Sequence, residues 1–437
     1  MNSKTFTEDL YQKMVDEEDA RACKAIDESA CKVVPGNFVL TIVSNFFSKL
    51  GDAVSNPKIV LPWIMETISA PLFLLGFLVP IRESGSMIPQ LVIADFIRKM
   101  EIRKWIWVLG SVLQAASMAG MGFVAWTMEG AAGGWMIIAL LIIFSLSRGL
   151  SSVAAKDVLG KTIPKSQRGK VTGWSASAAG LITLAYGIVL VFTPTDNFTP
   201  AVYGLMLVSA ALFWIAGAFV YAKIKEFPGE TSGGANGFLE AIKRVNILKT
   251  DKPFRKFVIT RSLLLCSALT APYYVVLAQD KLGSPAYLLG LFVIADGAAG
   301  LISGPIWGKF ADVSSRNVMI IAAALTAILG ISVFMIDSLQ SEWLSLMWVL
   351  PLVYFFLSIA HQGVRVGRKT YVVDLAEGNK RTDYVSVSNT LIGVILLLMG
   401  LTGTLATFLS ISQIILVLSM LGVIGAWMAK TLPDVEK

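Results

Sequence analysis

A mostly apolar stretch at residues 37–62 carries a polar cluster in its middle, and this combination restricts the possible folds more than any other part of the chain. A helix that spans the lipid core needs about 20 apolar residues, and Lys49 and Asp52 lie near the centre of such a span. A bare charge at that depth costs at least about 2.5–3.5 kcal/mol, so it must face protein or water. Asn45, Lys49 and Asp52 are spaced i, i+4, i+7 and share one helical face, which predicts a polar cavity inside a membrane protein.

The composition of the whole chain is typical of a membrane protein with several spans. Of its 437 residues, 55% are hydrophobic and only 15% are charged, against about 25% charged residues in soluble domains. Basic residues in cytoplasmic loops account for the net charge of +7, so we expect no nucleic-acid partner. The single histidine and the three cysteines form no zinc-binding spacing, and we expect neither a metal nor a cofactor.

Apolar runs separated by short polar breaks predict twelve transmembrane helices in a bilayer. Their predicted ranges are 37–62, 70–95, 104–127, 134–157, 171–193, 201–223, 257–279, 285–309, 317–337, 343–366, 384–407 and 411–430. Lysine and arginine gather in every second predicted loop. That alternation predicts a multi-pass protein of a bacterial-type inner (plasma) membrane with both termini in the cytoplasm.

A glycine- and serine-rich linker divides the chain into two similar parts. The motif at 70–76 resembles the motif at 285–290, which indicates an internal repeat. Two weakly similar six-helix halves are typical of transporters whose site lies between them near mid-membrane. We therefore predict an all-α membrane protein of two pseudo-symmetric six-helix bundles. The expected parts are a cytoplasmic segment with an amphipathic helix (1–35), the first bundle (36–223), a cytoplasmic linker (224–255), the second bundle (256–430) and a cytoplasmic tail (431–437).

The segment Gly308-Lys-Phe-Ala-Asp312-Val-Ser-Ser-Arg316, at the junction of the eighth and ninth predicted spans, resembles the loop signature of the major facilitator superfamily. In that family the glycine permits close helix packing, and the aspartate and the basic residue form a conformational latch. A partial copy at the junction of the second and third spans keeps Asp95 but has Leu91 in place of the glycine. The resemblance implies a twelve-helix transporter, and it identifies no subfamily.

Three further charges lie deep in predicted spans of the first half. Arg82 and Glu83 occupy the middle of the second span, between two prolines, a broken pattern that is tolerated where a helix lines a cavity. Adjacent helical residues point about 100° apart, so one of the two faces the cavity while the other pairs with span one or span four. The fork of Arg148 in span four suits a carboxylate or phosphate, from substrate or from Glu83. The structural alternative for each is an ion pair between helices.

The second half holds fewer deep charges. Asp296 in the middle of the eighth span is a candidate proton site, with packing against its small neighbours as the alternative. His361 and Arg365 share a face of the tenth span by i+4 spacing, where they could titrate or bind an anion. We expect Lys58 and Arg261, near the ends of their spans, to extend outward to the membrane surfaces.

No catalytic or ATP-binding motif is present in the sequence, which argues against an enzyme and leaves an ion gradient as the driving force. We expect a secondary active transporter that works by alternating access and is coupled to protons. Because Lys49, Arg82 and Arg148 outnumber the deep acids of the first half, we expect a small anionic or zwitterionic solute. Asp52, Glu83 or Asp296 would carry the proton, and sodium coordination by Asp52 and Asn45 stays open.

Two other functions stay open at this point. A proton-driven exporter of amphipathic compounds or lipids would have a mostly apolar cavity, with the charges paired away from it. A receptor or assembly factor built on a transporter scaffold would transport nothing. Substrate identity, direction, coupling ion and oligomeric state are not determined by the sequence.

Overall fold

The computed structural model describes residues 33–88, 93, 96–97, 99–193, 199–229, 231, 245–376 and 380–435. Throughout these residues the regular structure is helical, and nine helical stretches are long and apolar enough to cross a membrane. The predicted N-terminal amphipathic helix lies outside the described residues, as do Asp95 and much of the linker.

The first half contains seven α-helices and one 3-10 turn within the described residues. In chain order they are α3 (Val34–Val54), α4 (Val60–Thr67), η2 (Leu72–Leu74), α5 (Leu75–Met87), α7 (Lys104–Thr127), α8 (Gly130–Thr162), α9 (Lys165–Phe192) and α10 (Pro200–Ala222).

The second half is more interrupted than the first. In chain order its elements are α12 (Ile247–Thr250), α13 (Lys252–Leu263), α14 (Cys266–Leu269), α15 (Ala271–Leu282), α16 (Ala286–Ser338), η4 (Glu342–Ser345), α17 (Val349–Leu375), α18 (Lys380–Met399), η5 (Gly400–Thr407) and α19 (Ile411–Lys430).

Helix α16 accounts for two of the predicted spans. A straight helix of 53 residues would be about 80 Å long, far more than a bilayer needs. Ser314 has φ −163° and ψ 104°, which are not helical values, and the helix turns sharply there. The junction within the signature segment is therefore a bend and not a loop. With α16 counted twice and spans one and two assembled from shorter pieces, the helices are consistent with the twelve predicted spans.

The prediction of one continuous helix over residues 37–62 is wrong. Helix α3 ends at Val54 and α4 begins at Val60, with Asn56 and Pro57 between them. Proline has no N–H to donate and disfavours helical geometry in the preceding residue. The Asn56 Oδ1 atom accepts the backbone N–H of Lys58 at 2.9 Å, which stabilises the break. The seventh span is broken in a similar way, into α13, α14 and α15.

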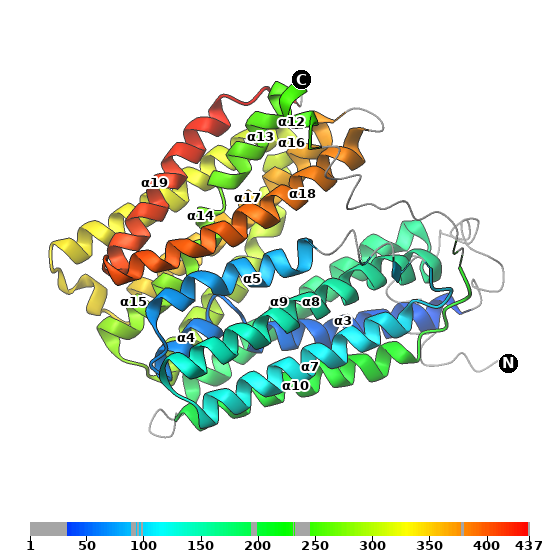
Figure 1. Cartoon of the computed structure of the whole chain (residues 1–437), viewed down its shortest axis with the longest axis horizontal. Coiled ribbons are helices and arrows are strands. Elements are labelled where there is room, and N and C mark those ends of the chain that lie inside the picture. Colours follow the sequence, from blue (N-terminus) through cyan, green and yellow to red (C-terminus); the bar gives the residue numbers. More distant parts are fainter. Residues whose placement is uncertain are drawn as a thin grey trace.

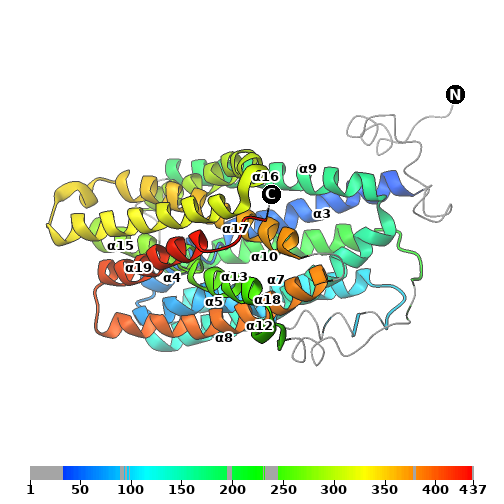
Figure 2. The ribbon, with the colours of Figure 1, turned by 90° about the horizontal axis from the view of Figure 1, so that it is seen from above.

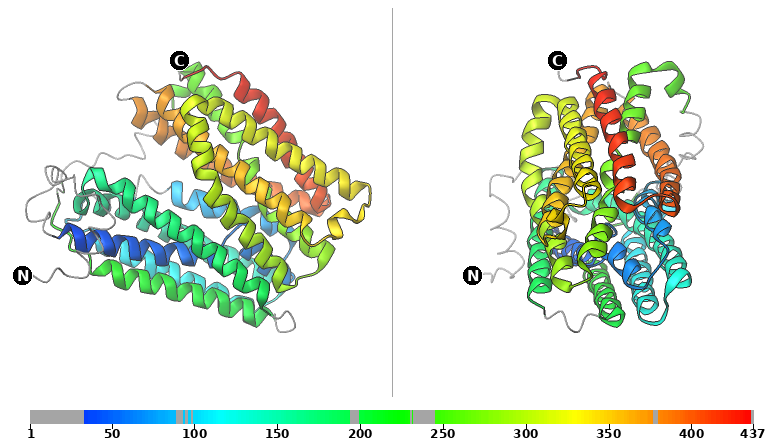
Figure 3. Two further views of the ribbon diagram at one scale, coloured as in Figure 1. Left: turned by 180° about the vertical axis from the view of Figure 1, so that it is seen from behind. Right: turned by 90° about the vertical axis from the view of Figure 1, so that its left-hand side faces the viewer.

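The two halves converge at the end where α4 and α15 lie and diverge toward the opposite end (Figures 1 and 3). We call these the closed end and the open end. Helices α9 and α16 lie side by side along one line of contact between the halves (Figure 2). On the other line α5 packs against α18 and η5, where Ser84 Oγ donates to the Gly393 carbonyl at 2.8 Å.

Glycine pairs allow the halves to touch backbone to backbone near the closed end. A Cβ on Gly76 of α5 would lie 2.5 Å from the Cα of Gly403 in η5. A Cβ on Gly290 of α16 would lie 2.8 Å from the carbonyl oxygen of Gly187 in α9. Gly76 and Gly290 end the two similar motifs of the sequence, so equivalent helices of the halves make equivalent crossings.

We predict that Gly76→Leu lowers the midpoint of thermal unfolding, because the added side chain would force α5 and η5 apart. Overpacking of this kind costs about 1–3 kcal/mol. The matched control is Gly300→Leu on α16, where no atom lies within 4 Å of the added Cβ. Tryptophan fluorescence of the purified protein measures both midpoints. Equal midpoints for the two variants would show that the crossing is not tightly packed.

Candidate functional site

Asp52 on α3 is held by two arginines from neighbouring helices of the first half. Arg148 on α8 donates from Nη1 to Oδ1 at 2.5 Å and from Nη2 to Oδ2 at 2.8 Å. Arg82 on α5 donates from Nη2 to Oδ1 at 3.1 Å. Such forked, charge-assisted bonds are the strongest hydrogen bonds that side chains make. The Asp52 cluster, as we call these three residues, joins three helices and keeps one surplus positive charge.

This geometry settles the partners of the two arginines. Arg82 pairs with Asp52 of span one, and span one is one of the two partners that the sequence allowed. The carboxylate bound by Arg148 is that of Asp52, and not that of Glu83. Lys49, one turn before Asp52, is exposed and makes no direct ion pair with any residue of the described chain.

Two cavities meet at Asp52. The central cavity, of about 190 Å³, lies between the halves and is lined by Asp52, Asn56, Pro57, Lys58, Arg82, Glu83, Ser267, Ala271, Asp296, Tyr354, Leu357, Ser358, His361, Gln362 and Arg365. The side cavity, of about 180 Å³, lies within the first half and is lined by Asn45, Ser48, Lys49, Asp52, Trp107, Ser111, Gln114, Arg148, Ser151, Ser152, Ala155 and Trp214.

The side cavity contains all three residues of the polar face of α3. Asn45, Lys49 and Asp52 line it together with Arg148. Asn45 also donates to the Ser175 hydroxyl on α9 at 3.5 Å. The i, i+4, i+7 spacing thus brings these side chains to one cavity, but this cavity lies beside the interface of the halves and not within it.

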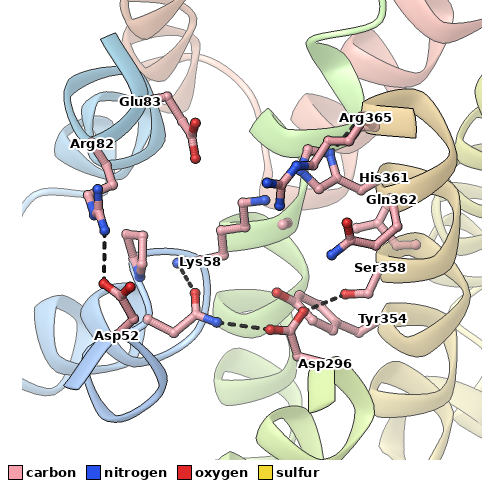
Figure 4. Close-up of a pocket in the computed structure, with 15 residues that line it drawn as sticks. Asp52, Lys58, Arg82, Glu83, Asp296, Tyr354, Ser358, His361, Gln362 and Arg365 are labelled. Atoms are coloured by element: carbon pink, nitrogen blue, oxygen red, sulfur yellow. Dashed lines mark hydrogen bonds and ion pairs between the residues drawn. The ribbon is translucent and has the colours of Figure 1, made fainter. Parts of the chain in front are cut away.

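The central cavity has a balanced charge. Its lining includes three cationic and three acidic side chains, namely Lys58, Arg82, Arg365, Asp52, Glu83 and Asp296. Arg82 and Asp52 form an ion pair. Figure 4 shows Glu83 beside Arg82 on the wall of the first half, Arg365 and His361 on the opposite wall, and Lys58 extending between them.

Four of these charges have no direct ion-pair partner within the described residues: Glu83, Lys58, Arg365 and Asp296, of which Asp296 is hydrogen-bonded to neutral groups. Glu83 comes from the first half and Arg365 from the second, so the free charges face each other across the interface. A charge removed from bulk water needs a compensating partner. The cavity therefore offers both a free carboxylate and free cationic groups to a bound molecule.

Asp296 joins the two halves through neutral groups. Its Oδ2 accepts from the Asn56 amide at 3.0 Å, and its Oδ1 accepts from the Ser358 hydroxyl at 2.8 Å (Figure 4). Asn56 belongs to the break in span one, whereas Ser358 belongs to α17 of the second half. The break thus presents its side chain directly to the candidate proton site.

The prediction that Lys58 extends to the outer membrane surface is wrong. Lys58 follows the break at Asn56 and Pro57, and its side chain lies in the central cavity (Figure 4). The Asn-Pro pair in the sequence is a turn signal that could have identified this break. A search for long apolar runs alone does not detect this break.

The prediction that Arg261 extends to the inner surface is also wrong. Its side chain is buried, with only 6% of the residue exposed. Nη1 donates to the Ser388 hydroxyl at 2.5 Å, and Nη2 donates to the Asn389 amide oxygen at 2.9 Å, both on α18. Arg261 therefore links α13 to α18 within the second half.

His361 and Arg365 both line the central cavity from α17, as their shared face predicts. The Nδ1 atom of His361 lies 3.1 Å from the Ser267 hydroxyl on α14, in the broken seventh span. In the described part of the chain, no cluster of three or more His, Cys, Asp or Glu side chains is placed to hold a metal ion.

The two charged residues of the proposed latch, Asp312 and Arg316, form no ion pair with each other. Asp312 is exposed and forms no ion pair with the described residues. Arg316 instead pairs with Asp434 of the tail at 3.4 Å. A Cβ on Gly308 would meet no atom within 4 Å, so no helix packs closely against it in this conformation. Their role as a latch stays a prediction.

The family description "Major Facilitator Superfamily" matches residues 41–400 of the sequence. The chain belongs to this superfamily. Membership makes it an integral, multi-pass membrane protein and a transporter, not an enzyme, and the all-α fold predicted from the sequence is confirmed.

Solved transporters share the fold over almost the whole chain. A D-xylose–proton symporter aligns with a TM-score of 0.66 at 15% identity, covering 92% of this chain and 98% of its own. The inward-open xylose transporter XylE from E. coli aligns with a TM-score of 0.68 at 12% identity, covering 91% and 97%. The nucleoside transporter NupG aligns with a TM-score of 0.65 at 11% identity, covering 91% and 98%. No curated protein matches the sequence significantly.

We predict that Asp52→Asn destabilises the protein, because it leaves two arginines close together without a counter-charge. Removing one partner of a buried pair costs about 3–5 kcal/mol, and the 20% exposure of Asp52 moves the expected loss toward the lower value. The control is Asp157→Asn, which removes a single 3.2 Å contact to Arg103 at a more exposed position. Thermal unfolding in detergent should show the larger loss for Asp52→Asn, and the reverse order would contradict the assigned role.

Proposed function

We propose that this transporter moves a small zwitterionic solute across the inner (plasma) membrane by alternating access, coupled to protons. One observation carries the proposal: Glu83, Lys58 and Arg365 stand without ion-pair partners, among the described residues, in a cavity between the halves. A solute that carries both an ammonium and a carboxylate or phosphate group would compensate all of these charges at once.

The balance of charge favours a zwitterion over a simple anion. The surplus positive charge expected from the sequence belongs to Arg148 and Lys49, which line the side cavity. In the central cavity an anion alone would pair with Lys58 and Arg365 but would be repelled by the carboxylate of Glu83. An apolar molecule would leave all three charges without a partner.

The alternative of an exporter of amphipathic compounds finds partial support. Arg82 and Arg148 are both occupied by Asp52, as that alternative requires. The remaining lining of the central cavity, however, is largely polar and charged and includes His361 and Gln362. The zwitterion proposal accounts for these groups, and the exporter alternative does not.

The arrangement of the halves supports alternating access from the inner side. The halves diverge at the open end (Figure 1), and basic residues such as Arg103, Lys161 and Lys256 belong to that end. Under the positive-inside rule the open end faces the cytoplasm, together with both termini. Asp312 and Arg316, without a contact between them, then represent a released latch.

Asp296 is the proposed coupling group. Its carboxylate accepts two hydrogen bonds and has no cation in direct contact within the described residues. Protonation would remove the charge that strengthens the bond from Asn56 and so weaken a link between the halves. Proton binding and movement of the halves would in this way be coupled.

We predict that Glu83→Gln and Arg365→Gln each weaken solute binding at least about tenfold, since a hydrogen bond to a charged group contributes about 1.5–3 kcal/mol. A thermal-shift screen of zwitterions on the purified protein identifies the solute, and counterflow uptake in proteoliposomes measures transport. The control is Lys256→Gln, which removes an exposed charge outside the cavity. Wild-type affinity in both cavity variants would reject the proposed substrate site.

We predict that Asp296→Asn abolishes accumulation driven by a pH gradient but retains solute exchange. In the wild type, acid on the side from which the solute is taken should raise accumulation, because the proton moves with the solute. The amide keeps one acceptor oxygen for Asn56 but cannot release a proton. Accumulation that still follows the pH gradient in Asp296→Asn would exclude this residue as the coupling group, and a response to sodium alone would exclude proton coupling.

A further inference from the structure

The side cavity contains two buried polar groups that no described residue satisfies. Its lining comes from α3, α7, α8 and α10, all of them in the first half. Ser111 on α7 is 0% exposed and Trp214 on α10 is 1% exposed. The Ser111 hydroxyl and the Trp214 Nε1–H have no hydrogen-bond partner within the described chain. Because buried polar groups in folded proteins are almost always hydrogen-bonded, each such exception needs an explanation.

The free hydroxyl of Ser111 has a cause in the packing of α7 against α8. A serine inside a helix can donate to the carbonyl one turn earlier, as Ser117 does to Leu113 at 2.8 Å. For Ser111 that carbonyl belongs to Trp107, and it accepts from the Ser151 hydroxyl of α8 at 3.3 Å. The Ser111 hydroxyl is thereby left for the cavity that Ser111 lines.

The indole of Trp214 is fixed by its neighbours. A Cβ on Gly51 would lie 2.9 Å from the six-membered ring of the indole, and Phe144 packs edge to face with ring centroids 5.2 Å apart. The N–H belongs to the other ring, and it cannot turn to a new acceptor without displacing these contacts. An indole N–H only donates, so the group that satisfies it must be an acceptor.

The charge of the lining indicates which kind of acceptor fits. Lys49 and Arg148 are cations and Asp52 is the one acid in the described lining, which leaves one surplus positive charge. Asp52 already accepts two bonds from Arg148. Lys49, in contrast, makes no direct ion pair with a described residue, and it is exposed, so the cavity is not sealed.

We infer that the side cavity binds a small monovalent anion, of the class of chloride or a short-chain carboxylate. One negative charge matches the single surplus positive charge, and the anion accepts from the Lys49 ammonium, the Ser111 hydroxyl and the Trp214 N–H. Water would satisfy the two neutral donors but would not compensate the ammonium. A sodium ion would be repelled by the surplus charge.

This site is separate from the proposed solute site. Within the described residues the linings of the two cavities share Asp52 and no other side chain. Anion binding in the side cavity therefore does not depend on the solute that crosses the membrane. Because the anion would also lie between Lys49 and Arg148, it would reduce the repulsion between them and stabilise the first half.

The test measures the unfolding midpoint of the purified full-length protein in a neutral detergent. Chloride or acetate replaces gluconate, a larger anion, at constant ionic strength, so that general screening does not change. A ligand that binds only the folded protein raises the midpoint as its concentration rises above the dissociation constant. We expect a saturable rise with chloride or with acetate, and the anion that acts identifies the ligand class. No rise with either anion would mean that the cavity holds water only and would overturn the inference.

Two variants remove one proposed donor each. Ser111→Ala and Lys49→Gln should weaken anion binding at least about tenfold, since each loses a hydrogen bond to a charged group. The matched control is Ser117→Ala on the same helix, whose hydroxyl is bound within α7 and outside the cavity. It should respond to the anion as the wild type does. A wild-type response in both Ser111→Ala and Lys49→Gln would contradict the inference.

The midpoint in gluconate separates the site from general damage to the fold. Without a bound anion, Ser111→Ala should unfold at the same or a higher temperature than the wild type, because it removes a buried hydroxyl that has no partner. A large loss of stability in gluconate would show that the hydroxyl is satisfied within the chain, and would speak against a ligand there.

Arg365→Gln decides between the two cavities. It removes a cation from the central cavity and leaves the lining of the side cavity unchanged. An anion response that Arg365→Gln retains and Lys49→Gln loses supports the side cavity. The opposite result would assign the anion to the central cavity and overturn the inference. Uptake of the zwitterionic solute is measured separately, so a failure here leaves the proposed transport function intact.

Discussion

A charge placed among apolar residues must find a partner, and the pairing of Asp52 with Arg82 and Arg148 is where this chain meets that requirement. The cluster joins α3, α5 and α8 at a single point of the first half. It also forms the wall between the two cavities, because Asp52 lines both. The remaining polar groups of the cavities are arranged around this fixed point.

The break in span one connects that fixed point to the second half. Because the helix ends at Val54, the segment that follows can turn its side chains toward the interface. Asn56 then binds Asp296, and Lys58 enters the central cavity. Non-helical backbone is tolerated at membrane depth where it lines a cavity. The interruption therefore shapes the wall of the central cavity.

The sequence was sufficient for the class of fold and for part of the site. Charges at the centre of an apolar span predicted a cavity, and their spacing placed Asn45, Lys49 and Asp52 together. The partner of Arg148 was not predictable, because it depends on the tilt and rotation of helices that are distant in the sequence. The burial of Arg261 was not predictable for the same reason, because its hydrogen-bond partners are neutral side chains on α18, far away in the sequence.

The distribution of charge partners agrees with a molecule whose halves move. None of the ion pairs seen between described residues joins one half to the other: Arg82–Asp52, Arg148–Asp52, Arg103–Asp157, Lys161–Glu226, Lys281–Asp337 and Arg316–Asp434. A buried ion pair between the halves would oppose their separation by several kcal/mol. The halves instead meet through apolar side chains, glycine backbones and single hydrogen bonds such as that of Asn56 to Asp296. A single hydrogen bond breaks at much lower cost than a buried ion pair. Charges that face the interface remain free for the solute, whose arrival can then change the balance between the two conformations.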